Sequence, residues 1–307
     1  MNYSDYKFTV SDHRKVRVII DTDAKNEADD QFAIVQALLS PRCIIKGLVA
    51  THFGLKGSGT MEQSYEEAKK ILDLMDIESK DFLYKGVSGK LADKEDLKES
   101  EGVDFIIREA MKEDEKQLIV MVLGAITNIA CAIKKEPKII NKMRVIWIGG
   151  GPYPSGEQEF NCLNDITAVN IVMESGVELW QVPKNVYSMM RVSLAELEYK
   201  VADKGELGAY LLQQLDEHAQ TDKKDNLPLR SGEYWILGDS PAIGLIIAEH
   251  VFDYEMRKAP IVLDDCTYAK ETHAHEIRVY QYVDSRFILE DFYAKLALFE
   301  HKRKYIK

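Results

Sequence analysis

The sequence has few cysteines and no long apolar run. No two of the four cysteines, Cys43, Cys131, Cys162 and Cys266, have the CxxC spacing of zinc ligands. Cysteines this far apart in 307 residues are weak evidence for disulfides, so we expect reduced thiols. No segment has the ~18 consecutive apolar residues of a membrane helix, and the N-terminal stretch lacks the apolar core of a signal peptide. These absences predict a cytoplasmic protein with no membrane partner.

Basic residues are also in deficit, with 40 lysines and arginines against 51 acidic residues and a net charge of −11. Broad electrostatic binding of nucleic acid needs a basic surface, so nucleic acid is not an expected partner. An acidic protein can instead gather divalent cations. The chain is long enough to bury a substantial hydrophobic core, and 46% of its residues are hydrophobic.

Short apolar runs alternate with segments of helical spacing. The predicted strands are Val16–Ile20, Ile44–Ala50, Lys116–Leu123, Val145–Ile148, Glu178–Val182 and Glu276–Val283. The predicted helices are Gln31–Leu39, Glu62–Met75, Thr127–Lys135, Asp165–Ser175, Lys204–Gln220, Ser240–His250 and Ser285–Phe299. This order is typical of an α/β fold with a largely parallel, doubly wound sheet flanked by helices. With no repeats or clear linkers, we expect a single domain over residues 1–307. The loop Lys223–Leu229 is a candidate flap.

Polar and glycine-rich loops follow several of these strands. They are Asp21–Asp30, Thr51–Thr60, Gly124 and Gly149–Asn161. In a parallel sheet, ligands bind outside the carboxyl ends of the strands. We therefore expect these loops to gather along one edge of the sheet and to form the functional site there.

The first of these loops, DTDAKNEADD, contains the four carboxylates of Asp21, Asp23, Asp29 and Asp30 within ten residues. Carboxylates this close repel one another, and a bound divalent ion removes the repulsion. Their hard oxygen atoms favour Ca²⁺ or Mg²⁺. In a purely structural interpretation, Asp29 and Asp30 complement the N-terminus of the following helix.

A strand followed by DxD also begins the haloacid-dehalogenase-like phosphatases. In that alternative Asp21 is the nucleophile and Asp23 the acid/base, and Gly238–Ser240 resembles the late metal motif of that superfamily. Lys25 stands where a Thr or Val is usual, and Ile243 replaces the final Asp of the late motif. These two departures weigh against a phosphatase.

Four motifs in the same order resemble the inosine–uridine-preferring nucleoside hydrolase family. DTDAKNEADD is similar to its N-terminal DxDPGxDD, with two extra residues and no Pro-Gly. Val122–Ala130 (VLGAITNIA) resembles TGPLTNIA, Gly149–Asp165 resembles GG…EFNxxxDPEA, and Leu237–Ile243 (LGDSPAI) resembles the late HDPxA segment. The resemblance implies a single α/β domain and Ca²⁺-dependent hydrolysis of the N-glycosidic bond of ribonucleosides to ribose and free base.

The resemblance also implies roles for individual residues. The carboxylates of Asp23, Asp30 and Asp239 and the main-chain oxygen of Leu123 would hold Ca²⁺, and Asp23 would be the catalytic base. Asp29, Glu159 and Asn161 would hydrogen-bond the ribose hydroxyls. The structural interpretations of three of these are a turn former for Asn161, a helix cap for Asp239 and a solvated loop charge for Glu159.

The sequence departs from the family pattern at the leaving-group acid. Many members have a His immediately before the late Asp, and this chain has Gly238. The candidates for a replacement acid or base contact are His52, Tyr187 and His218. A relative that binds a sugar or nucleoside without turnover therefore stays an alternative. The resemblance further suggests a homo-oligomer, a dimer or a tetramer, acting on a small nucleoside or ribosyl substrate.

Overall fold

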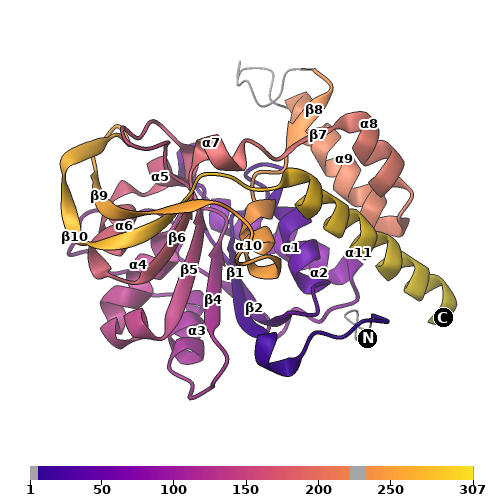
Figure 1. The fold of residues 1–307 in the computed structure, drawn as a ribbon, viewed down its shortest axis with the longest axis horizontal. Helices are drawn as coiled ribbons and strands as arrows, with labels where there is room; N and C mark the ends of the chain where they lie inside the picture. Colours follow the sequence, from indigo (N-terminus) through magenta and orange to yellow (C-terminus); the bar gives the residue numbers. More distant parts are fainter. Residues whose placement is uncertain (1–5, 222–231, 307) are drawn as a thin grey trace.

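The computed structural model describes residues 6–221 and 232–306, and an eight-stranded sheet of order β3-β2-β1-β4-β5-β6-β10-β9 forms its centre (Figure 1). The strands are β1 (Val16–Thr22), β2 (Cys43–Ala50), β3 (Leu83–Lys85), β4 (Leu118–Val122), β5 (Met143–Ile148), β6 (Glu178–Val182), β9 (Tyr254–Val262) and β10 (Tyr268–Tyr280). All neighbours pair in parallel except β9, which is antiparallel to β10. A separate antiparallel pair joins β7 (Arg191–Ser193) to β8 (Tyr234–Ile236).

Helices cover both faces of the sheet. They are α1 (Asp30–Leu38), α2 (Thr60–Leu74), α3 (Glu101–Ala110), α4 (Thr127–Lys135), α5 (Phe160–Asn164), α6 (Ile166–Ser175), α7 (Lys184–Tyr187), α8 (Leu194–Leu197), α9 (Gly205–Thr221), α10 (Ser240–Ile247) and α11 (Ser285–Ile306). One hydrophobic core joins the sheet to α1, α2, α10 and α11, and a second joins its other face to α3, α4 and α6. The predicted fold class, a largely parallel sheet with helices on both faces, is confirmed.

Strand β1 shows why the sheet is buried on both sides. All seven of its residues are buried. Val18 and Ile20 enter one core and Ile19 enters the other, because successive side chains of a strand point to opposite faces. A central parallel strand is covered by helices on both faces, so a continuous apolar run is what its position requires.

The order of the strands reverses beside β1. The chain passes from β1 through β2 to β3 on one side, then crosses to β4, β5 and β6 on the other. The acidic loop follows β1 and Leu123 follows β4. They therefore leave the sheet from the two neighbouring strands between which the order reverses. Such a switch point opens a crevice at the carboxyl ends of the strands, which is where doubly wound proteins bind ligands.

Several boundaries differ from those predicted from the sequence. Strand β10 begins at Tyr268 instead of Glu276, and α11 continues to Ile306. Strands β3 and β9 and helix α3 were not predicted. The alternation in Tyr254–Val262 is hidden because β9 is an edge strand whose first three residues are exposed and partly charged. The candidate flap Lys223–Leu229 lies outside the described residues. Over the described part of the chain, no helix combines the length and apolarity needed to cross a bilayer.

Candidate active site

The acidic loop leaves β1 and ends in α1, so both of its ends are fixed by secondary structure. Asp29 occupies the N-cap position of α1, but its side chain accepts no capping hydrogen bond. Its carboxylate instead lies with those of Asp30 and Asp239, each offering an oxygen atom within 4.8 Å of the others. Asp239 comes from the N-cap of α10, more than 200 positions along the chain. The fold thus brings the late acidic residue to the first loop, and the group so defined contains Asp29, a predicted ribose ligand, but not Asp23, a predicted metal ligand.

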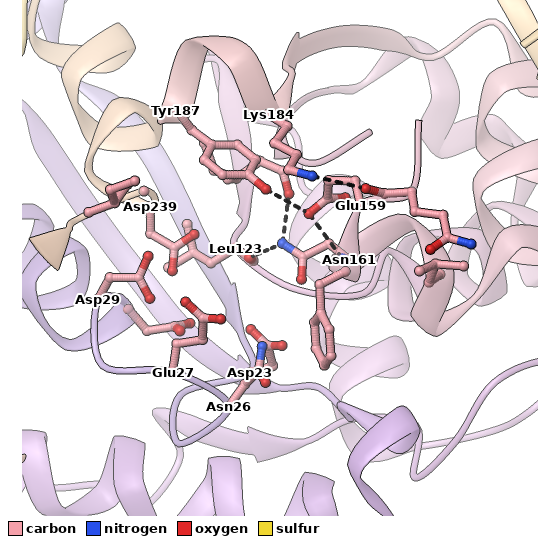
Figure 2. A pocket seen from close by; sticks show the side chains of 17 residues that line it. Asp23, Asn26, Glu27, Asp29, Leu123, Glu159, Asn161, Lys184, Tyr187 and Asp239 are labelled. Carbon is pink, nitrogen blue, oxygen red and sulfur yellow. Dashed lines mark hydrogen bonds between the residues drawn. The ribbon is translucent and has the colours of Figure 1, made fainter. Parts of the chain in front are cut away.

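These carboxylates line a cavity of about 340 Å³ at the switch point. Figure 2 shows Asp23, Glu27, Asp29 and Asp239 on one side of it and Tyr187, Glu159 and Asn161 on the other. The other lining residues are Asn26, Asp30, Leu123, Ile148, Gln158, Phe160, Leu163, Lys184, Ile236 and Gly238. Every residue predicted to bind metal or ribose therefore faces the same cavity.

Burial makes this cluster of carboxylates electrostatically costly. Burial, followed by the charges of neighbouring carboxylates, holds the pKa of Asp23, Asp29 and Asp239 well above its usual range. Burial also raises the pKa of Asp30 to about 6, although a hydrogen bond from Thr22 opposes the shift. A divalent cation among these oxygen atoms would lower the pKa values of the carboxyl groups again, because a nearby opposite charge favours the ionised carboxylate.

The residues present fit a hard divalent cation. Asp23 is 1% exposed, and its Oδ2 atom has no hydrogen-bond partner among the described residues. A buried carboxylate oxygen without a donor is unfavourable unless another group compensates it. Glycine at position 124 leaves room for the Asp23 side chain, because a Cβ atom there would lie 2.5 Å from Asp23 Cγ. The donor set consists of carboxylate and carbonyl oxygens, which are the ligands of Ca²⁺ and Mg²⁺.

Asn161 fixes the main-chain oxygen predicted to bind the metal. Its Nδ2 donates to the carbonyl oxygens of Leu123 at 2.8 Å and Ile148 at 2.9 Å. A carbonyl oxygen has two lone pairs, so that of Leu123 can accept this bond and still serve as a ligand. Asn161 therefore does more than form a turn, because it joins the ends of β4 and β5 at the wall of the cavity.

Glu159 is a buried anchor, not a solvated loop charge. Its Oε2 accepts from the backbone N–H groups of Gly150 and Cys162, and its Oε1 from those of Asn161 and the hydroxyl of Tyr187 at 3.1 Å. These four bonds use the four acceptor sites of a carboxylate. Burial raises the pKa of Glu159 while the backbone donors lower it.

Tyr187 fills the space beside Gly238. A Cβ atom on Gly238 would lie 3.1 Å from Tyr187 Cδ2 and 3.2 Å from Asp29 Oδ2, which is tighter than ordinary contact. The Tyr187 hydroxyl faces the cavity and donates to Glu159 (Figure 2). Burial and the nearby Glu159 charge raise the pKa of Tyr187 well above its usual value, so it is a hydrogen-bond donor that keeps its proton. The Tyr187 ring thus occupies part of the space that a side chain at position 238 would need.

The two histidine candidates do not line the cavity. His52 is fully buried, and its Nδ1 accepts from the Gly54 N–H. Its Nε2 therefore carries the proton and donates to Thr127 Oγ1 at 2.9 Å, and Thr127 in turn donates to Asp165. His218 packs edge-on against Trp235. Of the candidate acids, the geometry brings only Tyr187 to the site.

Asp21 also stays outside the cavity. It is fully buried, and its Oδ2 accepts a 2.8 Å hydrogen bond from Asn128 Nδ2. Burial raises the pKa of Asp21 to about 8. The phosphatase alternative requires Asp21 to attack a substrate in the same cavity as Asp23, and this position gives it no such access.

Several lining residues, Phe160 and Lys184 among them, were assigned no role in the site from the sequence. Glu27 lies in Ala24–Ala28, five residues that stand where the family pattern has three, and the sequence predicts that Asn26 or Glu27 replaces lost contacts or alters the approach to the metal. Phe160 and Lys184 line the opposite wall, and Lys184 pairs with Glu157 at 3.0 Å. Phe160 lies between Glu159 and Asn161 in the sequence, and this position in the motif is the feature from which its place at the site could have been predicted.

Comparison with known proteins agrees with this geometry. A model of the inosine-uridine preferring nucleoside hydrolase family matches residues 18–290. The chain is 26% identical to an uncharacterised protein of Schizosaccharomyces pombe over 204 residues, which are 58% of this chain and 64% of that protein. It is 29% identical to an inosine-uridine preferring nucleoside hydrolase of Leishmania major over 131 residues, 40% of this chain and 41% of that protein. The chain thus spans less than two thirds of the length of both relatives.

A solved structure shows the same fold. A purine-preferring ribonucleoside hydrolase from Gardnerella vaginalis superimposes with a TM-score of 0.74 at 21% identity, covering 92% of this chain and 99% of that one. The fold is that of the nucleoside hydrolases. Because the family model covers most of the sequence, the chain belongs to the inosine-uridine preferring nucleoside hydrolase family.

Proposed function

We propose that this protein is a Ca²⁺-dependent nucleoside N-ribohydrolase, which hydrolyses the N-glycosidic bond of ribonucleosides or a related N-riboside to ribose and free base. The observation that carries the proposal is the convergence of Asp29, Asp30 and Asp239 beside Asp23 in one cavity at the sheet's switch point. Membership of the family supports the same activity.

Asp23, Asp30 and Asp239 would hold the cation through their carboxylates, and Leu123 through its carbonyl oxygen. When bound, Ca²⁺ would polarise the ribose diol and lower the pKa of a nearby water. One oxygen of the Asp23 carboxylate would bind the cation and the other would accept a proton from the attacking water, so Asp23 would act as the general base.

Asp29, Glu159 and Asn161 would orient the ribose. All four acceptor positions of Glu159 are already used, three of them by backbone N–H groups that the fold holds in place. A ribose hydroxyl that binds Glu159 therefore displaces the Tyr187 hydroxyl. Holding the sugar at several points fixes the anomeric carbon relative to the water, which lowers the entropic part of the barrier.

The Tyr187 hydroxyl released by the sugar would be able to donate a hydrogen bond to the leaving group in the same cavity. Its raised pKa makes it a weak acid, so it stabilises the departing base by hydrogen bonding more than by full proton transfer. We therefore expect bases that leave with little assistance to react faster than those that must be protonated.

A sugar- or nucleoside-binding protein without turnover is the second candidate, and Gly238 favours it because no titratable side chain stands at that position. The two candidates differ in one measurement. Incubation with a panel of purine and pyrimidine nucleosides and Ca²⁺, followed by a reducing-sugar assay, gives free ribose from an N-ribohydrolase. Nucleoside binding by calorimetry with no ribose from any member of the panel would establish the binder instead.

Asp23→Ala tests the role of the base. We expect it to abolish ribose release, because it removes both a ligand and the proton acceptor. Asp264→Ala, at an exposed position on the turn after β9, is the matched control and should keep the wild-type rate. An unchanged rate in Asp23→Ala would overturn the assigned role.

Three further properties are proposals of the same kind. Residues 1–307 form a single nucleoside hydrolase-like domain, the chain assembles as a homo-dimer or homo-tetramer, and it acts in the cytoplasm without nucleic-acid or membrane partners. Light scattering of the purified chain measures the assembly directly.

A further inference from the structure

The acidic loop is two residues longer than the family pattern, and the structure holds the additional length firmly. Three contacts from distant parts of the chain restrain it: Lys25 Nζ–Glu67 Oε2 at 3.5 Å, Lys56 Nζ–Asn26 O at 2.7 Å and Gln214 Nε2–Ala28 O at 2.8 Å. Glu67 lies on α2 and Gln214 on α9, so the loop is fixed from two helices and from the segment after β2. A loop restrained in this way presents its remaining side chains in a defined direction.

Glu27 is the side chain that this loop presents to the cavity. It is half-buried and lines the wall beside Asp29 (Figure 2). Its side chain lines the same cavity as those of Asp23, Asp29 and Asp30. An insertion that only lengthened the loop would be less costly with a neutral residue here, because Glu27 adds a fifth carboxylate to four that already repel one another.

A second observation indicates what this carboxylate faces. Besides Asp23 Oδ2, the loop has another buried oxygen with no hydrogen-bond partner among the described residues, Oδ1 of Asn26. Asn26 is 6% exposed and lines the same cavity. Of the oxygens without a partner in this loop, those of Asp23 and Asn26 belong to residues that line the cavity, as Glu27 does. Oxygen atoms left without donors on the wall of a cavity are suited to a hard cation.

We propose that Glu27 is an additional carboxylate ligand of the divalent-cation site, and that the insertion carrying it strengthens the binding of Ca²⁺ relative to Mg²⁺. The inference rests on the metal dependence in the proposed function. Ca²⁺ accepts six to eight oxygen ligands in flexible geometry, whereas Mg²⁺ requires six in a nearly ideal octahedron and keeps several waters. A further protein oxygen therefore benefits the larger ion more.

Calorimetric titration of the metal-free full chain with Ca²⁺, and separately with Mg²⁺, tests the proposal. We expect Glu27→Gln to weaken Ca²⁺ binding by about tenfold or more and Mg²⁺ binding by less. The control is Glu66→Gln, which removes the same charge from an exposed position on α2 and should change neither Kd by more than about twofold. An unchanged Ca²⁺ Kd in Glu27→Gln would refute the role of Glu27.

Thermal unfolding separates loss of a ligand from damage to the fold. Removing one of several repelling carboxylates should leave the melting temperature of the metal-free protein equal or raise it, while the Ca²⁺-induced increase becomes smaller. Glu27→Asp keeps the charge on a shorter side chain and should bind Ca²⁺ more tightly than Glu27→Gln; equal binding by these two variants would also contradict the proposal. If the wild-type chain bound neither ion, the proposed Ca²⁺ dependence of the enzyme would be refuted. If wild type and Glu27→Gln bound Ca²⁺ equally, only the role of Glu27 would be refuted.

Discussion

Gly238→Ala tests whether the ring of Tyr187 has taken the space of the missing side chain. The new Cβ atom would lie 3.1 Å from Tyr187 Cδ2 and 3.2 Å from Asp29 Oδ2, where ordinary contacts are 3.4 Å or longer. Either the aromatic ring or the carboxylate must move by a few tenths of an ångström. Both line the candidate active site, so a single methyl group should disturb stability and activity together.

The size of the effect follows from overpacking. Extra methyl groups in a well-packed site cost about 1–3 kcal/mol. For a chain of 307 residues this corresponds to a fall in melting temperature of roughly 2–5 °C, taking about 2 cal/mol/K of unfolding entropy per residue. The nucleoside KM should rise as well, because Asp29 is proposed to bind the ribose.

Differential scanning fluorimetry and the ribose assay measure both effects. Gly89→Ala is the matched control, since a Cβ atom there has no neighbour within 4 Å, and it should melt within about 1 °C of wild type. In a Tyr187→Ala background the stability cost of Gly238→Ala should become smaller, because one of its two close contacts is gone. Wild-type stability and KM in Gly238→Ala, or an equal cost in both backgrounds, would refute the reasoning.

Two further predictions concern residues around the site. Burial lowers the pKa of His52 to about 4, whereas an unfolded histidine has a pKa near ~6.5. Between these values the unfolded chain binds a proton that the folded chain does not, so His52 lowers stability as the pH falls from ~6.5 to 4, by up to roughly 3 kcal/mol. Urea unfolding at several pH values should show a smaller fall for His52→Gln than for wild type; parallel curves would contradict this. Asn161→Ala leaves the buried carbonyls of Leu123 and Ile148 without their donor and should cost about 1–3 kcal/mol in urea unfolding. A cost below ~0.5 kcal/mol would show that these bonds do not hold the cavity wall.

The sequence predicts the fold best where strands are buried on both faces. Glu178–Val182 was predicted with the bounds that β6 has, and four of its five residues are buried in the sheet. Strand β9 was missed because at the edge of the sheet its charged exposed face hides the alternation. Helix α3 begins with the acidic and glycine residues of Glu101–Asp104, which also suit a loop. The secondary structure of such segments depends on how they are buried in the tertiary structure, and a local sequence pattern does not contain that information.

The candidate site was predictable because the carboxyl ends of parallel strands share one edge. That rule, together with the family motifs, placed Asp23, Asp30 and Asp239 together. Asp21 was predicted to lie behind the metal ligands, and in the structure it is outside the cavity with Asn128 as its hydrogen-bond partner. The sequence predicts that Asn26 or Glu27 replaces lost contacts or alters the approach to the metal, but it does not predict the direction of the Glu27 side chain, which depends on contacts from α2 and α9.

The most direct test is a Ca²⁺ titration of chelator-treated protein, with ribose release from inosine and uridine as the readout. We expect almost no release without metal, a saturable rise with Ca²⁺, and loss of activity when chelator is added again. Asp23→Asn should stay inactive at every Ca²⁺ concentration. The same rate of release with and without chelator, or full activity in Asp23→Asn, would contradict a calcium site built on Asp23, Asp30 and Asp239.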